Sequence, residues 1–136
     1  MTASHVLLVE DEELNRALVR AILARTAEPA VRDVALAEAG NLAAARDALA
    51  STPVDVVLLD LNLPDGNGLT LAAELAERAN GERPEVIALT ASVLPQDRAA
   101  AMAAGCDGFL DKPYAAADLV KVLATHLARR RGTPDA

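Results

Sequence analysis

Aromatic residues are almost absent from this sequence. Among 136 residues there is one Phe, one Tyr and no Trp, whereas 52% of the residues are hydrophobic. A chain of this length can bury a substantial core. We therefore expect an aliphatic core built from Ala, Val, Leu and Ile.

Cysteine, positive charge and long apolar runs are also scarce. Cys106 is the only cysteine, which excludes an internal disulfide and a cysteine-ligated metal cluster. The formal net charge of −7 argues against nucleic acid or an anionic membrane as the main partner, because both attract a basic face. No apolar run approaches the ~18 residues of a membrane span, and the start MTASHVLLVED lacks the basic region of a signal peptide. We expect a cytoplasmic domain.

Three short apolar runs each end at polar or acidic residues. They are rich in β-branched residues and lack alternation, which is typical of strands buried on both faces of a parallel sheet. A weaker run, Val31–Leu36, predicts a more exposed strand, and Gly108–Leu110 predicts a short fifth one. The stronger runs are Val6–Val9 before Glu10-Asp11, Val54–Leu59 before Asp60, and Val86–Leu89 before Thr90.

Helical patterns fill the gaps between these runs. Apolar residues recur at helical spacing in three segments, and Ala-rich stretches at 72–79 and 99–104 have high helix propensity. This alternation predicts an α/β fold, a doubly wound parallel sheet of five strands with helices on both faces. We expect residues 1–136 to form a single domain, with a core at about 5–130 and no output domain. The helical positions are Leu14, Leu18 and Ile22; Leu42, Ala45 and Leu49; and Leu119, Val122, Leu123 and Leu127.

Chemically reactive side chains follow the predicted strands. In an open parallel sheet, functional groups collect at the carboxyl ends of the strands, so three acids, a hydroxyl and an ammonium should meet at one edge. Carboxylates held this close repel one another and call for a cation. Oxygen ligands without His or Cys favour Mg²⁺, which takes one or two carboxylates together with waters and phosphate oxygens. The residues are Glu10, Asp11, Asp60, Thr90 and Lys112.

Such a site can accept a phosphoryl group. A carboxylate can act as the nucleophile and form an aspartyl phosphate. The cation would neutralise the acceptor and the incoming group, while Lys112 and the Thr90 hydroxyl would bind the remaining phosphoryl oxygens. The sequence thus contains every group that a phosphoryl acceptor needs, provided that the strand ends meet.

Four segments resemble the signature of response-regulator receiver domains of two-component signalling. They are VLLVED, VVLLDLNLPDGNG, ALTAS and FLDKPY, in this order and spacing, and the resemblance extends from His5 to about Arg130. It implies a flavodoxin-like sheet with strand order 2-1-3-4-5. It also implies phosphorylation on Asp60, a metal site formed by Glu10, Asp11, Asp60 and the backbone carbonyl of Asn62, and a cis peptide bond at Lys112-Pro113. The acidic pair here is Glu-Asp rather than Asp-Asp.

The resemblance further implies a switch. Thr90 matches the switch hydroxyl, Lys112 the phosphoryl-binding lysine, and Phe109 the switch aromatic. Asn62 and Ser92 match the positions that tune hydrolysis of the aspartyl phosphate. A domain of this type phosphorylates and dephosphorylates itself and is not a turnover enzyme.

The expected partners follow from the same resemblance. A histidine kinase or a histidine phosphotransferase would supply the phosphoryl group with Mg²⁺, and a downstream protein would sense the change. We expect no nucleic acid or membrane partner, and either a monomer or a phosphorylation-dependent dimer. Asn15-Arg16 and ALTASVLPQDR resemble receivers attached to hybrid histidine kinases, whereas Met1 and the polar tail favour a separate chain.

Two other classes have related features. A phosphatase of the haloacid dehalogenase type also uses an Asp nucleophile with Mg²⁺, but it needs a DxD motif at the end of the first strand, where this chain has Glu10-Asp11-Glu12. A flavodoxin-type binding module shares the sheet order, but the phosphate loop rich in Ser and Thr is missing after the first strand. Turnover of phosphomonoesters would indicate the phosphatase, and flavin bound to the purified protein would indicate the flavodoxin-type module.

Overall fold

The structure is a computed structural model that describes residues 4–78, 83–91 and 94–130. Five parallel strands form the central sheet in the order β2-β1-β3-β6-β7. Counting only these five strands, the order is 2-1-3-4-5, which confirms the prediction. The strands are β1 (His5–Val9), β2 (Ala35–Ala39), β3 (Val56–Asp60), β6 (Glu85–Thr90) and β7 (Gly108–Asp111).

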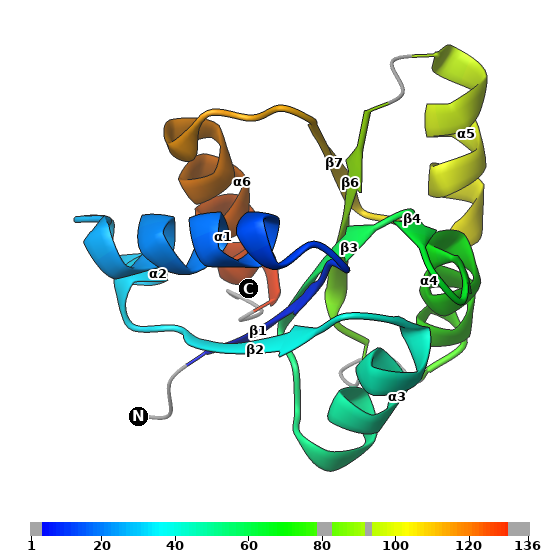
Figure 1. Cartoon of the computed structure of the whole chain (residues 1–136), viewed down its shortest axis with the longest axis horizontal. Coiled ribbons are helices and arrows are strands. Elements are labelled where there is room, and N and C mark those ends of the chain that lie inside the picture. The colour runs from blue at the N-terminus through cyan, green and yellow to red at the C-terminus, as the bar shows by residue number, and fades with distance from the viewer. Residues whose placement is uncertain (1–3, 79–82, 92–93, 131–136) are drawn as a thin grey trace.

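Helices cover both faces of the sheet (Figure 1). Residues of α1, α2 and α6 pack with Val6, Leu8 and Leu58 on one face, and residues of α3, α4 and α5 pack with Leu7 and Val57 on the other. Successive strand residues point to opposite faces, which is why residues 6–9 of β1 and 56–59 of β3 are all apolar and buried. The helices are α1 (Glu13–Arg25), α2 (Pro29–Arg32), α3 (Leu42–Ser51), α4 (Gly68–Ala76), α5 (Pro95–Ala104) and α6 (Ala116–Arg130).

The second strand lies later in the chain than the sequence pattern predicts. Val31 is buried in the short helix α2 and is not part of a strand. Pro29 occupies the first turn of α2, and the Glu28 carboxylate accepts a hydrogen bond from the amide of Ala30, so the local signals favour a helical turn. The strand begins only at Ala35, at the exposed edge of the sheet.

Helix α1 is present as predicted, but a different face of it is buried. Leu14 is 82% exposed and Leu18 is 49% exposed, whereas Val19 and Leu23 pack against the sheet. The predicted stripe of Leu14, Leu18 and Ile22 is therefore wrong as a core face. The buried stripe is rotated by one residue, because Val19 and Leu23 are also four residues apart. No helix within the described ranges is long and apolar enough to span a membrane.

A small antiparallel pair follows the third strand of the sheet. β4 (Asn62–Leu63) and β5 (Gly66–Asn67) turn the chain back directly after Asp60. Gly68 then starts α4, and its amide donates to the carbonyl of Leu61 at 2.9 Å. A Cβ atom at Gly68 would lie 2.5 Å from the Asp60 carbonyl oxygen and 3.0 Å from Leu61 Cα. Only glycine therefore lets α4 start this close to the end of β3.

We predict that Gly68→Ala destabilises the protein by about 1–3 kcal/mol, because the atoms in the way are backbone atoms of the sheet and the following loop. Urea denaturation followed by circular dichroism measures the loss. Gly40→Ala is the matched control, because its nearest contact would be an ordinary 3.5 Å to Arg16 Nη1. We expect that control to change stability by less than about 0.5 kcal/mol. Equal losses in the two variants would contradict the prediction.

Candidate functional site

The carboxyl ends of four strands meet at one edge of the sheet, as predicted. Val9 is in register with Leu59, Asp60 with Leu89, and Thr90 with Asp111. The residue that ends or follows each strand therefore lies beside its neighbours. These residues are Glu10 and Asp11 after β1, Asp60 in β3, Thr90 in β6, and Lys112 after β7.

Three carboxylates cluster at this edge. Glu10, Asp11 and Asp60 each offer an oxygen, and these oxygens lie within 4.8 Å of one another. Glu10 is 1% exposed and Asp60 is 6% exposed, whereas Asp11 is open to solvent. Two buried acids at this distance repel each other unless a cation or a proton intervenes.

Lys112 supplies a positive charge between the two buried acids. Its ammonium lies 2.8 Å from Glu10 Oε1 and 3.3 Å from Asp60 Oδ2. The backbone amide of Lys112 donates to the Thr90 carbonyl at 2.8 Å, which extends the β6–β7 ladder up to the site. The Lys112–Pro113 peptide bond is cis, as the resemblance implies.

The two buried carboxyl groups differ in proton affinity. Burial raises the pKa of Asp60, and the charge of Glu10 adds to this, while the Asn62 amide and Lys112 only partly oppose it. Burial alone would also raise the pKa of Glu10, but hydrogen bonds from Lys112 and from the Glu12 amide hold it below its ordinary value. Burial opposes the charge on Lys112 as well, yet its two carboxylate partners raise its pKa. Glu10 and Lys112 thus form the closer ion pair. The negative charge of Asp60 is less well compensated.

The other predicted site residues are only partly placed. The backbone amide of Asn62 donates to Asp60 Oδ1 at 3.0 Å, so the turn after β3 orients the Asp60 carboxylate. Thr90 is half-buried as the last residue of β6. Ser92 lies outside the described residues.

Phe109 lies in β7 and is half-buried against the core. The guanidinium carbon of Arg98 is 5.2 Å from the centroid of its ring, a cation–π contact. Arg98 also pairs with the carboxylate of Asp111, the residue before Lys112. No pattern in the sequence predicts this contact, because Arg98 and Phe109 lie on different elements.

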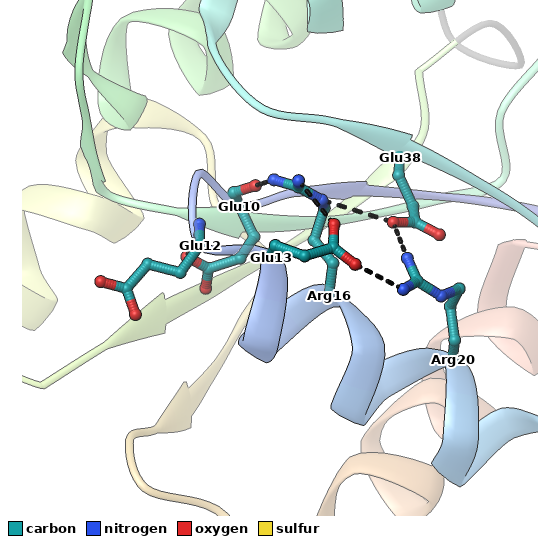
Figure 2. A network of polar contacts seen from close by, with 6 residues as sticks. All are labelled: Glu10, Glu12, Glu13, Arg16, Arg20 and Glu38. Atoms are coloured by element: carbon teal, nitrogen blue, oxygen red, sulfur yellow. Dashed lines mark hydrogen bonds and ion pairs between the residues drawn. The ribbon is translucent and has the colours of Figure 1, made fainter.

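A second group of polar residues contacts the backbone of the acidic pair. Arg16, from the Asn15-Arg16 pair, donates to the Glu10 carbonyl oxygen and lies among Glu13, Arg20 and Glu38 (Figure 2). No spacing in the sequence predicts this role for Arg16. Glu38 lies in β2, so only the folded sheet brings it to this place.

Comparison with known proteins agrees with this geometry. Residues 6–124 match the family described as the response regulator receiver domain. The chain belongs to this family. It is a receiver domain of two-component signalling and a phosphoacceptor switch. The family match therefore favours this class over the phosphatase and flavodoxin alternatives.

Among curated relatives, the chain is 37% identical over 119 residues to the two-component response regulator ORR41 of Oryza sativa subsp. japonica, which covers 88% of this chain and 91% of that protein. It is 38% identical over 124 residues to the aerobic respiration control sensor protein ArcB of Escherichia coli. That match covers 90% of this chain but only 15% of ArcB. The chain therefore corresponds to nearly all of one relative and to a small part of the other.

Solved structures give the same fold. The receiver domain of sensor histidine kinase PA1611 from Pseudomonas aeruginosa, solved with a magnesium ion in its active site cleft, matches with a TM-score of 0.78 and 28% identity. The match covers 93% of this chain and 99% of that one. The chemotaxis response regulator CheY4 of Vibrio cholerae matches with a TM-score of 0.80 at 22% identity, covering 92% and 99%, which is a likeness of fold.

We predict that Asp60→Asn stabilises the metal-free protein at neutral pH. A raised pKa means that the contribution of Asp60 to stability is complete below its unfolded pKa and is lost as the pH rises through its folded pKa. The variant should therefore match wild type in acid and exceed it by about 1 kcal/mol near neutrality. Urea denaturation in EDTA across this pH range measures the difference.

Asp47→Asn, which makes the same change at an exposed position of α3, is the control. Its free energy of unfolding should stay close to that of wild type across the same pH range. An Asp60→Asn protein less stable than wild type near neutral pH would mean that the ionised Asp60 is a net favourable partner of Lys112.

Proposed function

We propose that Asp60 is the phosphoryl acceptor of this receiver. The observation that carries the proposal is the Lys112 ammonium bridging Glu10 and Asp60, with the Asp11 carboxylate beside them. Within the cluster, Asp60 is the carboxylate with the raised pKa. Its oxygens lie near the Lys112 ammonium and the two neighbouring acids. A nucleophile in this position lies beside an ammonium and beside carboxylates that can hold a metal ion. Both positive charges would stabilise the oxygens of an incoming phosphoryl group.

The same carboxylates fit a magnesium ion. Three carboxylates against one ammonium leave two negative charges, which a divalent cation would balance. All the ligands are oxygens, as Mg²⁺ prefers, and the similar PA1611 receiver was solved with magnesium in its cleft. Glu10, Asp11, Asp60 and the Asn62 carbonyl would hold the ion. Bound there, Mg²⁺ would supply positive charge to the acceptor and to the transferred phosphoryl group together.

The proposed transfer uses residues that lie at this edge of the sheet. An Asp60 carboxylate oxygen attacks the phosphorus, and the bond from phosphorus to the donor breaks, with the electron pair leaving on the donor atom. The Asn62 amide holds Asp60 Oδ1 in place during the attack. Lys112 is in position to bind an oxygen of the new phosphoryl group, and the Thr90 hydroxyl would bind another.

Hydrolysis later returns the carboxylate and releases inorganic phosphate. Asn62 is exposed next to the acceptor and leaves room for an attacking water. We assign the tuning of this step to Asn62 and Ser92, which lie two residues after Asp60 and Thr90. One phosphoryl group is accepted and lost per cycle, so the domain is a switch rather than a turnover enzyme.

The donor, in this proposal, is a histidine kinase or a histidine phosphotransferase. Similarity to the receiver of a sensor histidine kinase and to the sensor protein ArcB supports a phosphorelay. The net charge of −7 favours a protein partner over nucleic acid or an anionic membrane. Cytoplasmic location, action as a separate single domain, and a monomer or a phosphorylation-dependent dimer stay predictions.

The acceptor assignment predicts a specific labelling result. Incubation with acetyl phosphate and Mg²⁺ should add one phosphate that is stable in acid and labile in base, because an acyl phosphate forms. Intact-mass spectrometry measures the added group. Asp60→Asn should remain unlabelled, and EDTA should abolish labelling of wild type.

The control for this experiment is Asp47→Asn, which should label like wild type. If Asp60→Asn is labelled as fully as wild type, Asp60 is not the acceptor. Steady release of phosphate from phosphomonoesters would instead support the phosphatase alternative.

We also propose that phosphorylation moves Phe109. Once Asp60 carries a phosphoryl group, the Thr90 hydroxyl would turn toward it and leave space for the ring of Phe109. Movement of the ring would break its contact with Arg98, which links β7 to α5. The surface formed by α5, β7 and α6 would then change, and a downstream protein could sense it.

This switch predicts long-range changes in the amide spectrum. Adding beryllofluoride, an analogue of the phosphoryl group, should shift the amides of Arg98 and Phe109 as well as those around Asp60. Heteronuclear NMR measures the shifts, and Asp60→Asn should show none of them. Shifts limited to residues around Asp60 would disprove the movement of Phe109.

A further inference from the structure

The carbonyl of Glu10 marks the point where the β1–β2 ladder ends. The Glu10 amide donates to the Ala39 carbonyl at 2.9 Å, and Ala39 is the last residue of β2. The amide and the carbonyl of a strand residue point to the same side, so the Glu10 carbonyl faces the space where β2 would continue. The chain bends away at Gly40 instead.

The guanidinium of Arg16 takes the place of the missing strand amide. Arg16 Nη1 donates to the Glu10 carbonyl oxygen at 2.6 Å. The same nitrogen lies against the bend, because a Cβ atom at Gly40 would be 3.5 Å from it. A buried backbone acceptor at the end of the ladder is thereby satisfied by a charged donor, which makes a stronger hydrogen bond than an amide.

Acidic residues hold this guanidinium in place (Figure 2). Arg16 Nη2 lies 2.9 Å from Glu13 Oε1, and Arg16 Nε lies 3.4 Å from Glu38 Oε1. Arg20 joins the same two carboxylates, at 2.7 Å from Glu13 Oε2 and 2.5 Å from Glu38 Oε1. The Arg16 side chain is only 19% exposed. These contacts tie α1 to β2 and fix the direction of the bond to Glu10.

The peptide unit that Arg16 holds is the one between Glu10 and Asp11. Its orientation sets the directions in which these two neighbouring carboxylates leave the backbone. The helix start does not replace this restraint, because Glu12 at the N-cap of α1 makes no side-chain capping bond. The Glu12 amide instead donates to Glu10 Oε2 at 3.2 Å.

We propose that Arg16 is a positioning residue for the acidic pair, and that it sets the affinity for Mg²⁺ by holding the Glu10–Asp11 peptide unit. The inference rests on the metal site of the proposed function. The charge of Arg16 alone would act in the opposite direction, since a nearby cation disfavours Mg²⁺. Loss of positioning therefore predicts weaker Mg²⁺ binding, whereas loss of charge alone predicts tighter binding.

The test compares Arg16→Met with Arg20→Met in the full chain. Both variants remove one positive charge from the same two carboxylates, but only Arg16 contacts the Glu10 carbonyl. Calorimetric titration with Mg²⁺ should show binding about tenfold weaker in Arg16→Met, the lower end of the effect when a group orienting metal ligands is lost. Arg20→Met should stay within about twofold of wild type. Arg16→Met binding as tightly as wild type, or both variants weakened alike, would overturn the inference.

Two further variants separate the hydrogen bond from side-chain size and folding. Arg16→Lys keeps a charge and can donate one hydrogen bond to the carbonyl, so it should bind Mg²⁺ at least about threefold more tightly than Arg16→Met, although charge alone predicts the reverse. Failure to recover would count against the inference. If Arg16→Met does not fold by circular dichroism in EDTA, Arg16→Gln takes its place with the same expected loss.

Asp11→Asn separates this inference from the proposed function. If Asp11→Asn binds Mg²⁺ as tightly as wild type, or if wild type does not bind Mg²⁺ at all, the proposed metal site is wrong and the role of Arg16 falls with it. If Asp11→Asn loses binding while Arg16→Met keeps it, the metal site stands and only the role of Arg16 is wrong.

Discussion

Glu10 and Asp60 are buried at the ends of adjacent strands, and the Lys112 ammonium lies within 2.8 and 3.3 Å of them. Removing two carboxylates from water and placing them side by side is costly without such a partner. Lys112 follows β7 and Glu10 follows β1, so the ion pair depends on the register of β3 and β6, which lie between those two strands. The register of the strands therefore sets the geometry of the site.

Lys112 does not fully balance the negative charges of Glu10, Asp11 and Asp60. The remaining negative charge favours binding of a cation. Glu10 receives the closer contact with Lys112, whereas Asp60 keeps a raised pKa because it is buried beside another acid. A site that fully neutralised Asp60 would bind a divalent cation, or a phosphoryl group with its metal, less strongly. Burying Asp60 beside Glu10 therefore costs some stability, as is common at functional sites.

Much of the fold and of the site could be predicted because both depend on local sequence patterns. The apolar runs end at Glu10, Asp60 and Thr90, and the topology then brings these ends together. Two features could not be predicted in this way. Leu14/Leu18/Ile22 and Val19/Leu23 are overlapping apolar stripes on one helix, and only packing against the sheet selects between them. The contact between Arg16 and Glu38 joins α1 to β2, and no spacing in the sequence reveals it.

The same ion pairs give the proposed switch a physical route. Lys112 directly follows Asp111, whose carboxylate is paired with Arg98, and Arg98 lies over the ring of Phe109. In the proposed switch, movement of the Phe109 ring would displace Arg98 and so disturb its pair with Asp111, next to Lys112. Phe109 would then lose its contact with the Arg98 cation at the same time as Thr90 makes room for its ring. Each of these contacts contributes little free energy, but together they act on the Phe109 side chain. A local change in charge can thereby select between two packed arrangements.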